Sequence, residues 1–400
     1  MPFTIVDINN FWSPSGGGVR RYHLQKMAFY EQQSEVHSIF IMPDKKTYTE
    51  EKSEGLTIEH VEAFRFPGNW EYRFIWKQSQ IKPILEKYNP DLIEVGSPYI
   101  LPTVVRRCVE SIKSKSALVG FWHADFPVTY VGRPVAQKVG VSLGTFCRNE
   151  AFSYARREFK NFDCIQASSK EVMARLKKNN LPDPRWIPLG CDINTFRPEK
   201  RDEKLVAELK DGNPERLTIF FPHRHCKEKG IDLILDAYDI LVEKLGHEPA
   251  IIFAGTGPYL QQVQEAEKKH PHIRYVGFIN SAEEMARYYA SADIGLALSG
   301  WETFGLSILE SMASGNAQIG AFAGAAFEHV TESGAGSILS ERTPEALAHA
   351  IIELYHSDLS QKKLNARHYA EKFSWGESFK RQLALYKELV NKKQGNTNYL

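Results

Sequence analysis

The fold of this chain is decided by the stretch Ser299-Gly300-Trp301-Glu302-Thr303-Phe304-Gly305-Leu306-Ser307-Ile308-Leu309-Glu310. It follows an apolar run, residues 293–298, that is typical of a buried strand. From Leu306 onward, apolar side chains recur at roughly helical spacing. The stretch therefore predicts a strand, a glycine-containing turn and a helix, with the turn at the point where the helix begins.

The start of this expected helix is suited to binding phosphate, because unpaired N–H groups and the positive end of the helix dipole favour anions. Five consecutive backbone amides would lie there, those of Thr303, Phe304, Gly305, Leu306 and Ser307. Glu302 and Glu310 frame them, and along a continuous helix these two residues would be ~12 Å apart. That span is comparable to a sugar, a diphosphate and a ribose laid end to end, which suggests a nucleotide sugar.

The spacing E-x-F-G-x-x-x-x-E also resembles a motif of a known family, the retaining glycosyltransferases of the glycogen-synthase-like and mannosyltransferase-like group (glycosyltransferase family four). The resemblance implies an α/β protein of the GT-B fold, in which two doubly wound Rossmann-like parallel-sheet domains face a cleft. It also implies that Glu302 accepts hydrogen bonds from sugar hydroxyls and Glu310 from the ribose. Taken alone, the two glutamates are more simply interpreted as a helix cap and a solvated side chain.

At 400 residues the chain exceeds what one hydrophobic core usually supports, which favours two domains. We place an acceptor-side domain at residues 1–195 and a nucleotide-sugar donor domain at residues 196–374. By the same resemblance, residues 375–390 form a helix that crosses back to the first domain, and residues 391–400 are a flexible tail. A formal charge of +1 gives no general attraction to nucleic acid, so no nucleic-acid partner is expected.

The sequence shows no features of export or membrane insertion. Residues 1–10 are typical of a strand and lack the pattern of a secretory signal. No apolar run approaches the ~18 to 20 residues of a transmembrane helix. Five scattered cysteines without a C-x-x-C pair argue against a disulfide framework and a structural zinc site. We therefore expect a cytoplasmic protein.

A glycine-rich loop, Gly16-Gly17-Gly18, follows the first expected strand and leads into an expected helix. Glycines there let the backbone approach a ligand closely, although a flexible turn is the simpler alternative. The pattern is not the G-x-G-x-x-G of a dinucleotide site. In the family that the chain resembles, the loop matched by Gly17, Gly18 and Val19 lies over the donor diphosphate. Arg20 and Arg21 stand where many relatives carry an acidic residue first, which leaves the acceptor undefined.

His123 follows another expected strand, residues 117–122. In parallel α/β sheets, ligands bind beyond the carboxyl ends of the strands. A loop histidine is more often a hydrogen-bonded bystander than a catalyst, and its chemistry alone does not decide between the two. The resemblance implies that His123 contacts the transferred sugar near its primary hydroxyl.

Residues 132–160 carry six basic and two acidic side chains, interleaved with apolar ones. A solvated helix face is the simpler interpretation. The alternative is that the basic stretch 133–160 forms an acceptor-side surface for anionic lipid headgroups, as in relatives that act on lipids. A peripheral contact of this kind would place the protein at the inner face of the membrane.

Arg224 and Lys229 flank a short loop after an expected strand, residues 217–222. A guanidinium and an ammonium placed there can clamp diphosphate oxygens and stabilise charge on a departing nucleotide. Surface charge is the simpler alternative. The family carries Gly-Arg where this chain has His223-Arg224, and Lys-Gly at Lys229-Gly230, so the resemblance assigns both cations to the diphosphate. Two later turns, at Gly257 and Phe278, lie near the nucleotide in relatives.

In this order and at these intervals, the motifs imply a retaining hexosyltransferase that moves a sugar from a nucleotide sugar to a lipid or glycan acceptor. Its catalytic residues would be His123, Glu302, Arg224 and Lys229. We favour GDP-mannose as the donor, with UDP-glucose next. No D-x-D pair is evident, so neither a metal ion nor a cofactor is expected. A sugar-nucleotide epimerase, a phosphorylase of the same fold and a non-catalytic nucleotide-sugar-binding protein remain as alternatives.

Overall fold

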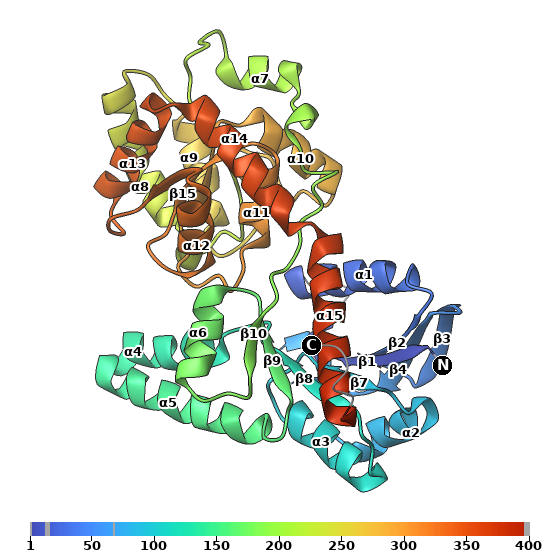
Figure 1. Ribbon diagram of the computed structural model, residues 1–400. Helices are drawn as coiled ribbons and strands as arrows, with labels where there is room; N and C mark the ends of the chain where they lie inside the picture. The colour runs from blue at the N-terminus through green and yellow to red at the C-terminus, as the bar shows by residue number, and fades with distance from the viewer. Residues whose placement is uncertain (1, 13–16, 67–68, 396–400) are drawn as a thin grey trace. The chain divides into compact units, whose positions relative to one another are not determined.

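The computed structural model describes residues 2–12, 17–66 and 69–395. The chain divides into two compact units, Met1–Pro188 with Trp375–Leu400, and Leu189–Ser374 (Figure 1). The division falls a few residues before the expected boundary at 195/196. The side chain of Arg367 explains this difference, because it donates to the carbonyls of Ile193 and Phe196 at 3.1 and 2.9 Å and so holds this segment on the second unit.

The first unit is built on an eight-stranded sheet in the order β10-β9-β8-β7-β1-β2-β4-β3. Neighbouring strands in it are parallel, except that β3 and β4 are antiparallel. The central strands are short, mainly apolar and mostly buried, as expected when helices cover both sides of a parallel sheet, and their few polar residues, Asp7, Glu94 and Gln166, are buried with them. The strands of this unit, including the hairpin β5–β6, are β1 Phe3–Ile8, β2 Val36–Asp44, β3 Tyr48–Ser53, β4 Leu56–Glu62, β5 Phe64–Phe66, β6 Asn69–Phe74, β7 Leu92–Val95, β8 Ala117–Phe121, β9 Cys164–Ala167 and β10 Pro184–Trp186.

The helices of the first unit are α1 Gly18–Glu31, α2 Gln78–Tyr88, α3 Leu101–Ile112, the π-helix η1 Pro127–Gly132, α4 Arg133–Val139, α5 Val141–Glu158, α6 Lys170–Lys178 and α15 Trp375–Gln394. Helix α15 returns to the first unit as expected, since Leu383, Tyr386 and Leu389 join a core cluster with Ile5 of β1. It continues past the predicted end at residue 390. Lys393 explains the extension, because its ammonium lies 2.6 Å from an Asp163 carboxylate oxygen. The last part of the predicted tail, residues 396–400, lies outside the described residues.

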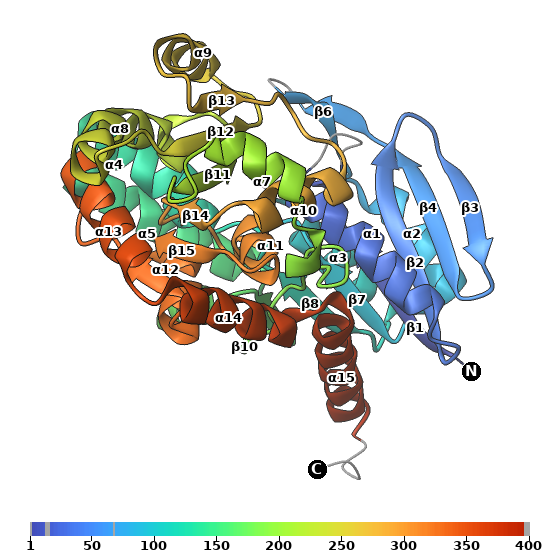
Figure 2. The same ribbon diagram turned by 90° about the horizontal axis from the view of Figure 1, so that it is seen from above.

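The second unit has a six-stranded parallel sheet in the order β13-β12-β11-β14-β15-β16. In Figure 2, α8 and α13 lie on one side of these strands and α10 and α11 on the other, which makes the unit doubly wound. Its elements are η2 Pro198–Lys200, α7 Glu203–Lys210, β11 Thr218–Pro222, η3 Lys227–Lys229, α8 Ile231–Leu245, β12 Ala250–Ala254, α9 Leu260–Lys269, β13 Ile273–Tyr275, α10 Ala282–Ser291, β14 Ile294–Ala297, α11 Leu306–Ala313, β15 Ala317–Gly320, α12 Gly324–Ser333, β16 Gly336–Ile338, α13 Pro344–His356, α14 Leu359–Ala370 and η4 Glu371–Phe373.

Each sheet has a point where the strand order reverses. In the first unit, β1 lies between β2 and β7, and in the second, β11 lies between β12 and β14. Ligands of open α/β sheets bind beyond the carboxyl ends of the strands at such switch points. Ligand sites are therefore expected in the segments that follow β1, β7 and β8 in one unit and β11 and β14 in the other.

A buried ion cluster joins the elements of the first unit. The Lys26 ammonium is fully buried and lies 2.7 Å from an Asp7 oxygen and 2.9 Å from a Glu94 oxygen. Glu94 also accepts hydrogen bonds from Gln166, at 3.1 Å, and from the Tyr386 hydroxyl of α15. Because an unpaired buried charge is strongly destabilising, this cluster ties together α1, β1, β7, β9 and α15.

The pKa values of the two carboxyl groups in the cluster are shifted in opposite directions. Burial raises the pKa of Glu94 to about 7, with the charge of Asp7 acting in the same direction and that of Lys26 against it. Burial also acts to raise the pKa of Asp7, but the charges of Lys26 and His23 beside it lower that pKa overall. Glu94 is therefore the group whose protonation changes near neutral pH.

We predict that Glu94→Gln removes a pH-dependent part of the stability. A carboxyl group whose pKa is higher in the folded state stabilises the fold below its unfolded pKa, and this contribution is lost as the pH rises through its folded pKa. As the pH rises from about 5 to about 8, ionisation of Glu94 should therefore lower the free energy of unfolding by about 2 kcal/mol. Urea unfolding at several pH values should show this decline in the wild type and a flatter profile in the variant.

Glu59→Gln is the matched control for this prediction. The pKa of Glu59 is lowered by hydrogen bonds from Tyr88, Lys87 and Thr49, which outweigh the effect of burial. Glu59 therefore stays ionised between about pH 5 and pH 8, and its variant should show a profile parallel to the wild type. A Glu94→Gln profile that is also parallel would contradict the assignment.

Candidate functional site

Two predicted site residues meet at the switch point of the second sheet. Lys229 ends η3, which follows β11, and Glu302 lies in the segment after β14. The Lys229 ammonium contacts a carboxylate oxygen of Glu302, and the two side chains are 20% and 27% exposed. The structure thus brings a cation and a carboxylate, which the sequence assigned to different parts of one ligand, into a half-buried ion pair.

The surroundings of this pair are partly desolvated. Burial lowers the pKa of Lys229, while the negative charge of Glu228 acts in the opposite direction. Its contact with Glu302 also favours the charged ammonium. Burial, together with the charge of Lys229, lowers the pKa of the neighbouring His223 to about 3, so that this imidazole is neutral at physiological pH. The Arg224 side chain is exposed on the same loop.

Arg342, which the sequence analysis missed, holds the two segments together. One of its terminal nitrogens donates to the Leu298 carbonyl at 2.9 Å, and the other to the Lys227 carbonyl at 2.5 Å. The first carbonyl lies just beyond β14 and the second in η3. Arg342 thereby fixes the spacing between the loops that carry Lys229 and Glu302, and nothing in its local sequence marks it for this role.

The segment after β14 is anchored by its own backbone. The Phe304 carbonyl accepts a hydrogen bond from His329 Nε2 at 2.7 Å, and the Phe304 ring is 3% exposed. The Glu302 carbonyl accepts from the Ala325 amide at 3.1 Å. Phe304 is therefore an anchor, and its predicted role toward the diphosphate is limited to its backbone. No local pattern marks His329, which lies in α12.

Helix α11 begins at Leu306, after a glycine turn, as the apolar spacing predicted. Glu302 therefore lies outside the helix, and the ~12 Å separation along a continuous helix does not apply to Glu302 and Glu310. Gly305 ends the turn in a left-handed conformation with φ of 75°. A Cβ atom at that position would lie 2.5 Å from Ile308 Cδ1. The amides of Leu306 and Ser307 belong to the first helical turn, where no intrahelical carbonyl can accept from them.

Glu310 differs from Glu302 in its surroundings. It lies within α11 and is only 7% exposed, whereas Glu302 is half-buried before the helix. The carbonyl of Glu310 accepts from the amide and the hydroxyl of Ser314, at 3.1 and 3.0 Å. The ribose contact that the resemblance assigns to Glu310 stays a prediction.

The other predicted residues of the second unit lie after β12 and β13. A Cβ atom at Gly257 would be 2.4 Å from the His225 carbonyl oxygen. Packing between the two loops therefore already requires glycine there, whether or not a nucleotide lies beside it. Phe278 follows β13 and is 64% exposed. It is available to a ligand at the carboxyl end of the sheet.

The predicted residues of the first unit also lie at strand ends. Gly17 precedes α1 and Gly18 is its first residue, and both are exposed. A Cβ atom at Gly17 would meet nothing within 4 Å. Gly16 lies outside the described residues. His123 follows β8 and is half-buried, with its ring 5.3 Å from that of Tyr22.

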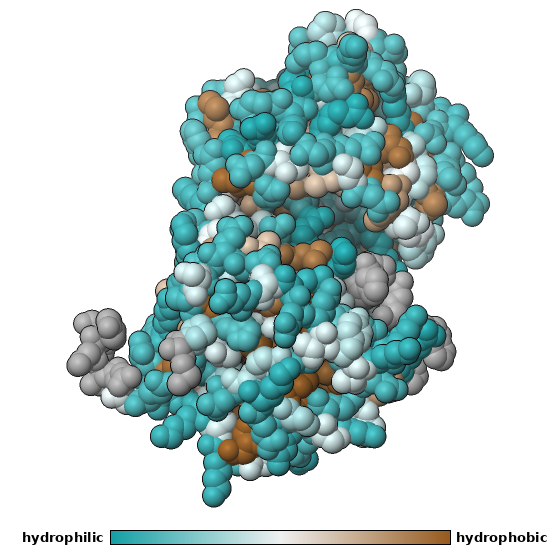
Figure 3. Space-filling view, turned by 90° about the vertical axis from the view of Figure 1, so that its right-hand side faces the viewer, coloured by the Kyte–Doolittle hydropathy of each residue, from teal (hydrophilic) through white to brown (hydrophobic). Residues whose placement is uncertain are grey.

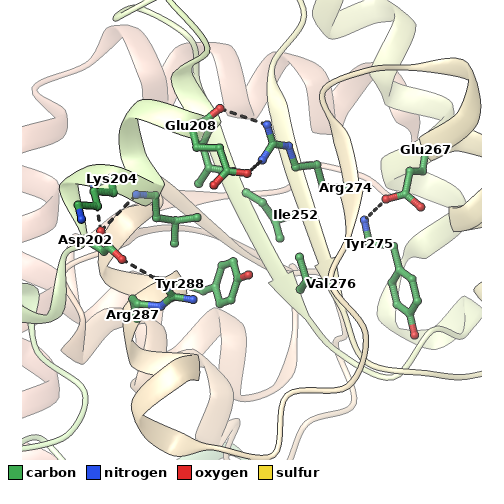
Figure 4. Close-up of a pocket in the computed structure, with 12 residues that line it drawn as sticks. Asp202, Lys204, Glu208, Ile252, Glu267, Arg274, Tyr275, Val276, Arg287 and Tyr288 are labelled. Atoms are coloured by element: carbon green, nitrogen blue, oxygen red, sulfur yellow. Dashed lines mark hydrogen bonds and ion pairs between the residues drawn. The ribbon is translucent and has the colours of Figure 1, made fainter.

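A pocket of about 430 Å³ lies elsewhere in the second unit, between α7, α10 and the strands β12 and β13 (Figure 4). None of the predicted site residues lines it. Its charged side chains pair with one another, as Glu208 does with Arg274 at 2.5 Å and Asp202 with Arg287 at 3.0 Å. We therefore place the candidate site at the strand ends and not in this pocket.

The start of α11 gives a test of the local structure. We predict that Gly305→Ala destabilises the protein more than Gly212→Ala. Both glycines have left-handed backbones, with φ of 75° and 73°, and an alanine there costs ~1 to 2 kcal/mol. A Cβ atom at Gly212 meets nothing within 4 Å, whereas at Gly305 it would collide with the buried Ile308. Urea unfolding should show an additional loss of ~1 kcal/mol for Gly305→Ala, and equal losses would contradict the packing described.

Comparisons with known proteins bear on the family and the fold. Residues 202–373 match the family described as glycosyl transferases group 1. A GDP-mannose-dependent alpha-(1-6)-phosphatidylinositol dimannoside mannosyltransferase of Mycobacterium tuberculosis is 26% identical over 93% of this chain and 92% of its own length. A GDP-mannose-dependent alpha-mannosyltransferase of Corynebacterium glutamicum is 22% identical over 90% of this chain and 83% of its own length.

Among solved structures, a sucrose-phosphate synthase of Thermosynechococcus elongatus superposes with a TM-score of 0.75 over 97% of this chain and 99% of its own, at 18% identity. Identity at this level establishes a shared fold. Together with the family match and the mannosyltransferase relatives, it confirms the expected architecture. Residues 202–373, most of the second unit, thus match the family of glycosyl transferases that the motifs resemble, and the chain has the GT-B fold.

Proposed function

We propose that this protein is a retaining hexosyltransferase that moves a sugar from GDP-mannose, in preference to UDP-glucose, to a lipid or glycan acceptor. The observation that carries the proposal is the Lys229–Glu302 pair, which lies at the switch point of the second sheet. The two relatives named above support GDP-mannose, because their names state that they depend on it. Independence of metal ions is part of the proposal.

Different residues of the second unit would bind different parts of the donor. Lys229, Arg224 and the first-turn amides of α11 would hold the diphosphate and stabilise its charge as the nucleotide departs. Glu302 would accept hydrogen bonds from hydroxyls of the sugar, and Glu310 from the ribose. In the reaction, the acceptor hydroxyl attacks from the face that the nucleotide leaves, and a donor phosphate oxygen takes the acceptor proton.

The ion pair also implies an order in which the diphosphate and the sugar of the donor are bound. Without donor, Lys229 and Glu302 neutralise each other in a partly desolvated place. A diphosphate brings a higher negative charge than one carboxylate, so it competes with Glu302 for the ammonium. Binding of the diphosphate to Lys229 would therefore free the Glu302 carboxylate to accept hydrogen bonds from the sugar hydroxyls.

A thermal-shift screen against GDP, UDP, ADP and their hexose derivatives tests the donor. We predict that GDP-mannose gives the largest shift. A ligand at 100 times its dissociation constant stabilises the folded protein by ~2.7 kcal/mol, which is readily measured. Glu310→Gln should reduce this shift, because an amide nitrogen replaces one of the two acceptor oxygens offered to the ribose.

Glu243→Gln is the control for that variant, since Glu243 is an exposed glutamate on α8 of the same unit. Incubation with GDP-mannose and lipid or glycan acceptors then tests transfer, and the anomeric configuration of the product tests retention. Donor consumption without an acceptor product would favour an epimerase or a phosphorylase. Binding without any turnover would favour a nucleotide-sugar-binding protein.

A helical hairpin of the first unit supports a lipid acceptor. Helices α4 and α5 pack closely, because a Cβ atom at Gly144 of α5 would lie 2.5 Å from the Cβ atom of Ala136 in α4 (Figure 1). Large apolar side chains on and beside this hairpin are exposed by 46% to 76%, namely Tyr130, Val139, Val141, Leu143 and Phe146. By contrast, the face of the molecule in Figure 3 is mainly hydrophilic, with small separate hydrophobic patches.

The charge of the hairpin fits an anionic membrane surface. Lys138 is exposed beside Val139 and Val141, and Arg157 is exposed further along α5. Exposed apolar side chains next to cations are suited to insert between the headgroups of anionic lipids. In the part of the chain that the structure describes, no helix is long and apolar enough to cross a membrane. We propose a peripheral contact of this hairpin with anionic lipid.

We predict that the protein co-sediments with vesicles that contain phosphatidylglycerol more strongly than with phosphatidylcholine vesicles. Phe146→Ser should weaken the binding severalfold, because it removes a 61% exposed aromatic ring from the hairpin. Leu364→Ser is the control, since Leu364 is 53% exposed on α14 of the other unit. If the two variants lose binding equally, or the wild type binds neither vesicle, the hairpin is not a membrane contact.

A further inference from the structure

The side chain of Asn9 has a fixed orientation at the switch point of the first sheet. Asn9 follows β1 directly and is 2% exposed. Its Oδ1 atom lies 2.7 Å from the Phe11 amide nitrogen and accepts its hydrogen bond. Because a backbone N–H can only donate, this contact identifies the oxygen of the Asn9 amide. The NH2 group therefore points the other way.

The Asn9 NH2 group faces two imidazoles. Its nitrogen lies 3.3 Å from His23 Nε2 and 3.3 Å from Nε2 of His123, the residue predicted to orient the hexose. An amide NH2 group only donates, so His123 Nε2 must accept. A neutral imidazole that accepts at Nε2 carries its proton on Nδ1. Asn9 thus selects one of the two neutral tautomers of His123.

Gly96 leaves the space that this contact needs. It is the first residue after β7, and its amide donates to the Ile8 carbonyl at 2.9 Å, which fixes the distance between the strand ends. A Cβ atom at Gly96 would lie 2.4 Å from Asn9 Nδ2 and 3.0 Å from His123 Nε2. Any other residue would therefore push the amide and the imidazole out of place. This restriction is independent of any ligand.

Burial and the positive charges around His123 disfavour its protonation. Burial lowers the pKa of His123 well below its ordinary value, and His23 and Lys26 add to this effect, while Asp7 opposes it. His23 is placed differently, since its Nδ1 lies 2.8 Å from the Val19 carbonyl oxygen and its Nε2 lies 3.4 Å from an Asp7 oxygen. Burial and the nearby positive charges therefore favour the neutral form of the His123 ring.

We propose that Asn9 is a positioning residue for His123, which it holds as a neutral imidazole with the proton on Nδ1. The consequence for catalysis rests on the proposed function, because it requires that His123 contact the sugar. Breaking a bond to an anomeric carbon develops positive charge on the sugar in the transition state. A charged imidazolium beside the sugar would oppose this charge. A neutral ring does not, and it still donates one hydrogen bond.

Nitrogen-15 NMR of histidine-labelled protein tests the proposal without any assay of activity. It distinguishes protonated from unprotonated ring nitrogens, and the His123 signals are assigned by comparison with His123→Gln. In the wild type between about pH 6 and pH 8, we expect protonated Nδ1 and unprotonated Nε2. In Asn9→Asp, the carboxylate accepts from Nε2, which should become protonated, and the pKa of His123 should rise. A proton on Nε2 of the wild type overturns the proposal.

Asn10→Asp is the matched control. Asn10 is the next buried residue, and its side chain hydrogen-bonds to the amide and carbonyl of Ile75, at 3.0 and 3.1 Å. The variant adds the same negative charge nearby without touching His123, and its tautomer should stay unchanged. Equal changes in both variants would indicate a general charge effect and overturn the assignment to Asn9. If Asn9→Asp does not fold, Asn9→Ser replaces it, and the preference for Nδ1 should be lost.

The catalytic consequence is measured separately. With the donor found in the nucleotide screen, Asn9→Asp should lower kcat by about tenfold or more and leave the dissociation constant of the nucleotide unchanged. An altered tautomer with an unchanged kcat overturns the positioning role. Absence of transfer by the wild type contradicts the proposed function only, because the NMR result on His123 stands on its own.

Discussion

The buried ammonium of Lys26 is the charge on which the first unit depends. An ammonium without a partner in the interior would cost several kcal/mol, and here two carboxylates on neighbouring strands, Asp7 and Glu94, compensate it. Three tyrosine rings surround the same atom at 5.5 to 5.8 Å from their centroids, those of Tyr22, Tyr30 and Tyr386. Because these groups come from α1, β1, β7 and α15, the charge is satisfied only when all four elements are in place. The C-terminal helix is therefore part of the core that sets the end of β1, and with it the position of Asn9.

The second unit depends on backbone conformation more than on buried charge. Gly305 ends the segment after β14 in a left-handed conformation, and the Phe304 carbonyl next to it is held by His329. The helix α11 can therefore start only at Leu306, with its first amides at the carboxyl end of the sheet. Arg342 joins this segment to the loop after β11 through two carbonyls. The side chains of Lys229 and Glu302 meet because both of their backbones are fixed in this way.

The sequence was sufficient for the architecture, because strand and helix patterns are local, and it placed the predicted site residues at strand ends, which parallel strands bring together at one edge of a sheet. Lys229 and Glu302 were assigned to one ligand from their motifs, but their ion pair depends on side-chain positions that no local pattern records. Lys26 was not predicted at all, because lysine is rarely buried and its carboxylate partners lie on separate strands. The separation of Glu302 and Glu310 could not be predicted, since the ~12 Å figure holds only for a continuous helix and Glu302 lies before the left-handed Gly305. The role of Asn9 was also out of reach, because it follows from the orientation of one amide group.

On the proposed function, the charges of the donor site balance in two different states. Without donor, the Lys229 ammonium and the Glu302 carboxylate compensate each other while partly desolvated, which spares both groups an uncompensated burial. With a diphosphate present, the ammonium and the Arg224 guanidinium face a stronger anion, and the start of α11 adds positive charge from its dipole. The carboxylate that Lys229 leaves behind then needs hydrogen-bond donors, and the hydroxyls of a hexose supply them. A nucleotide without its sugar would leave Glu302 with water alone, so the site as built favours the intact nucleotide sugar over the free nucleotide.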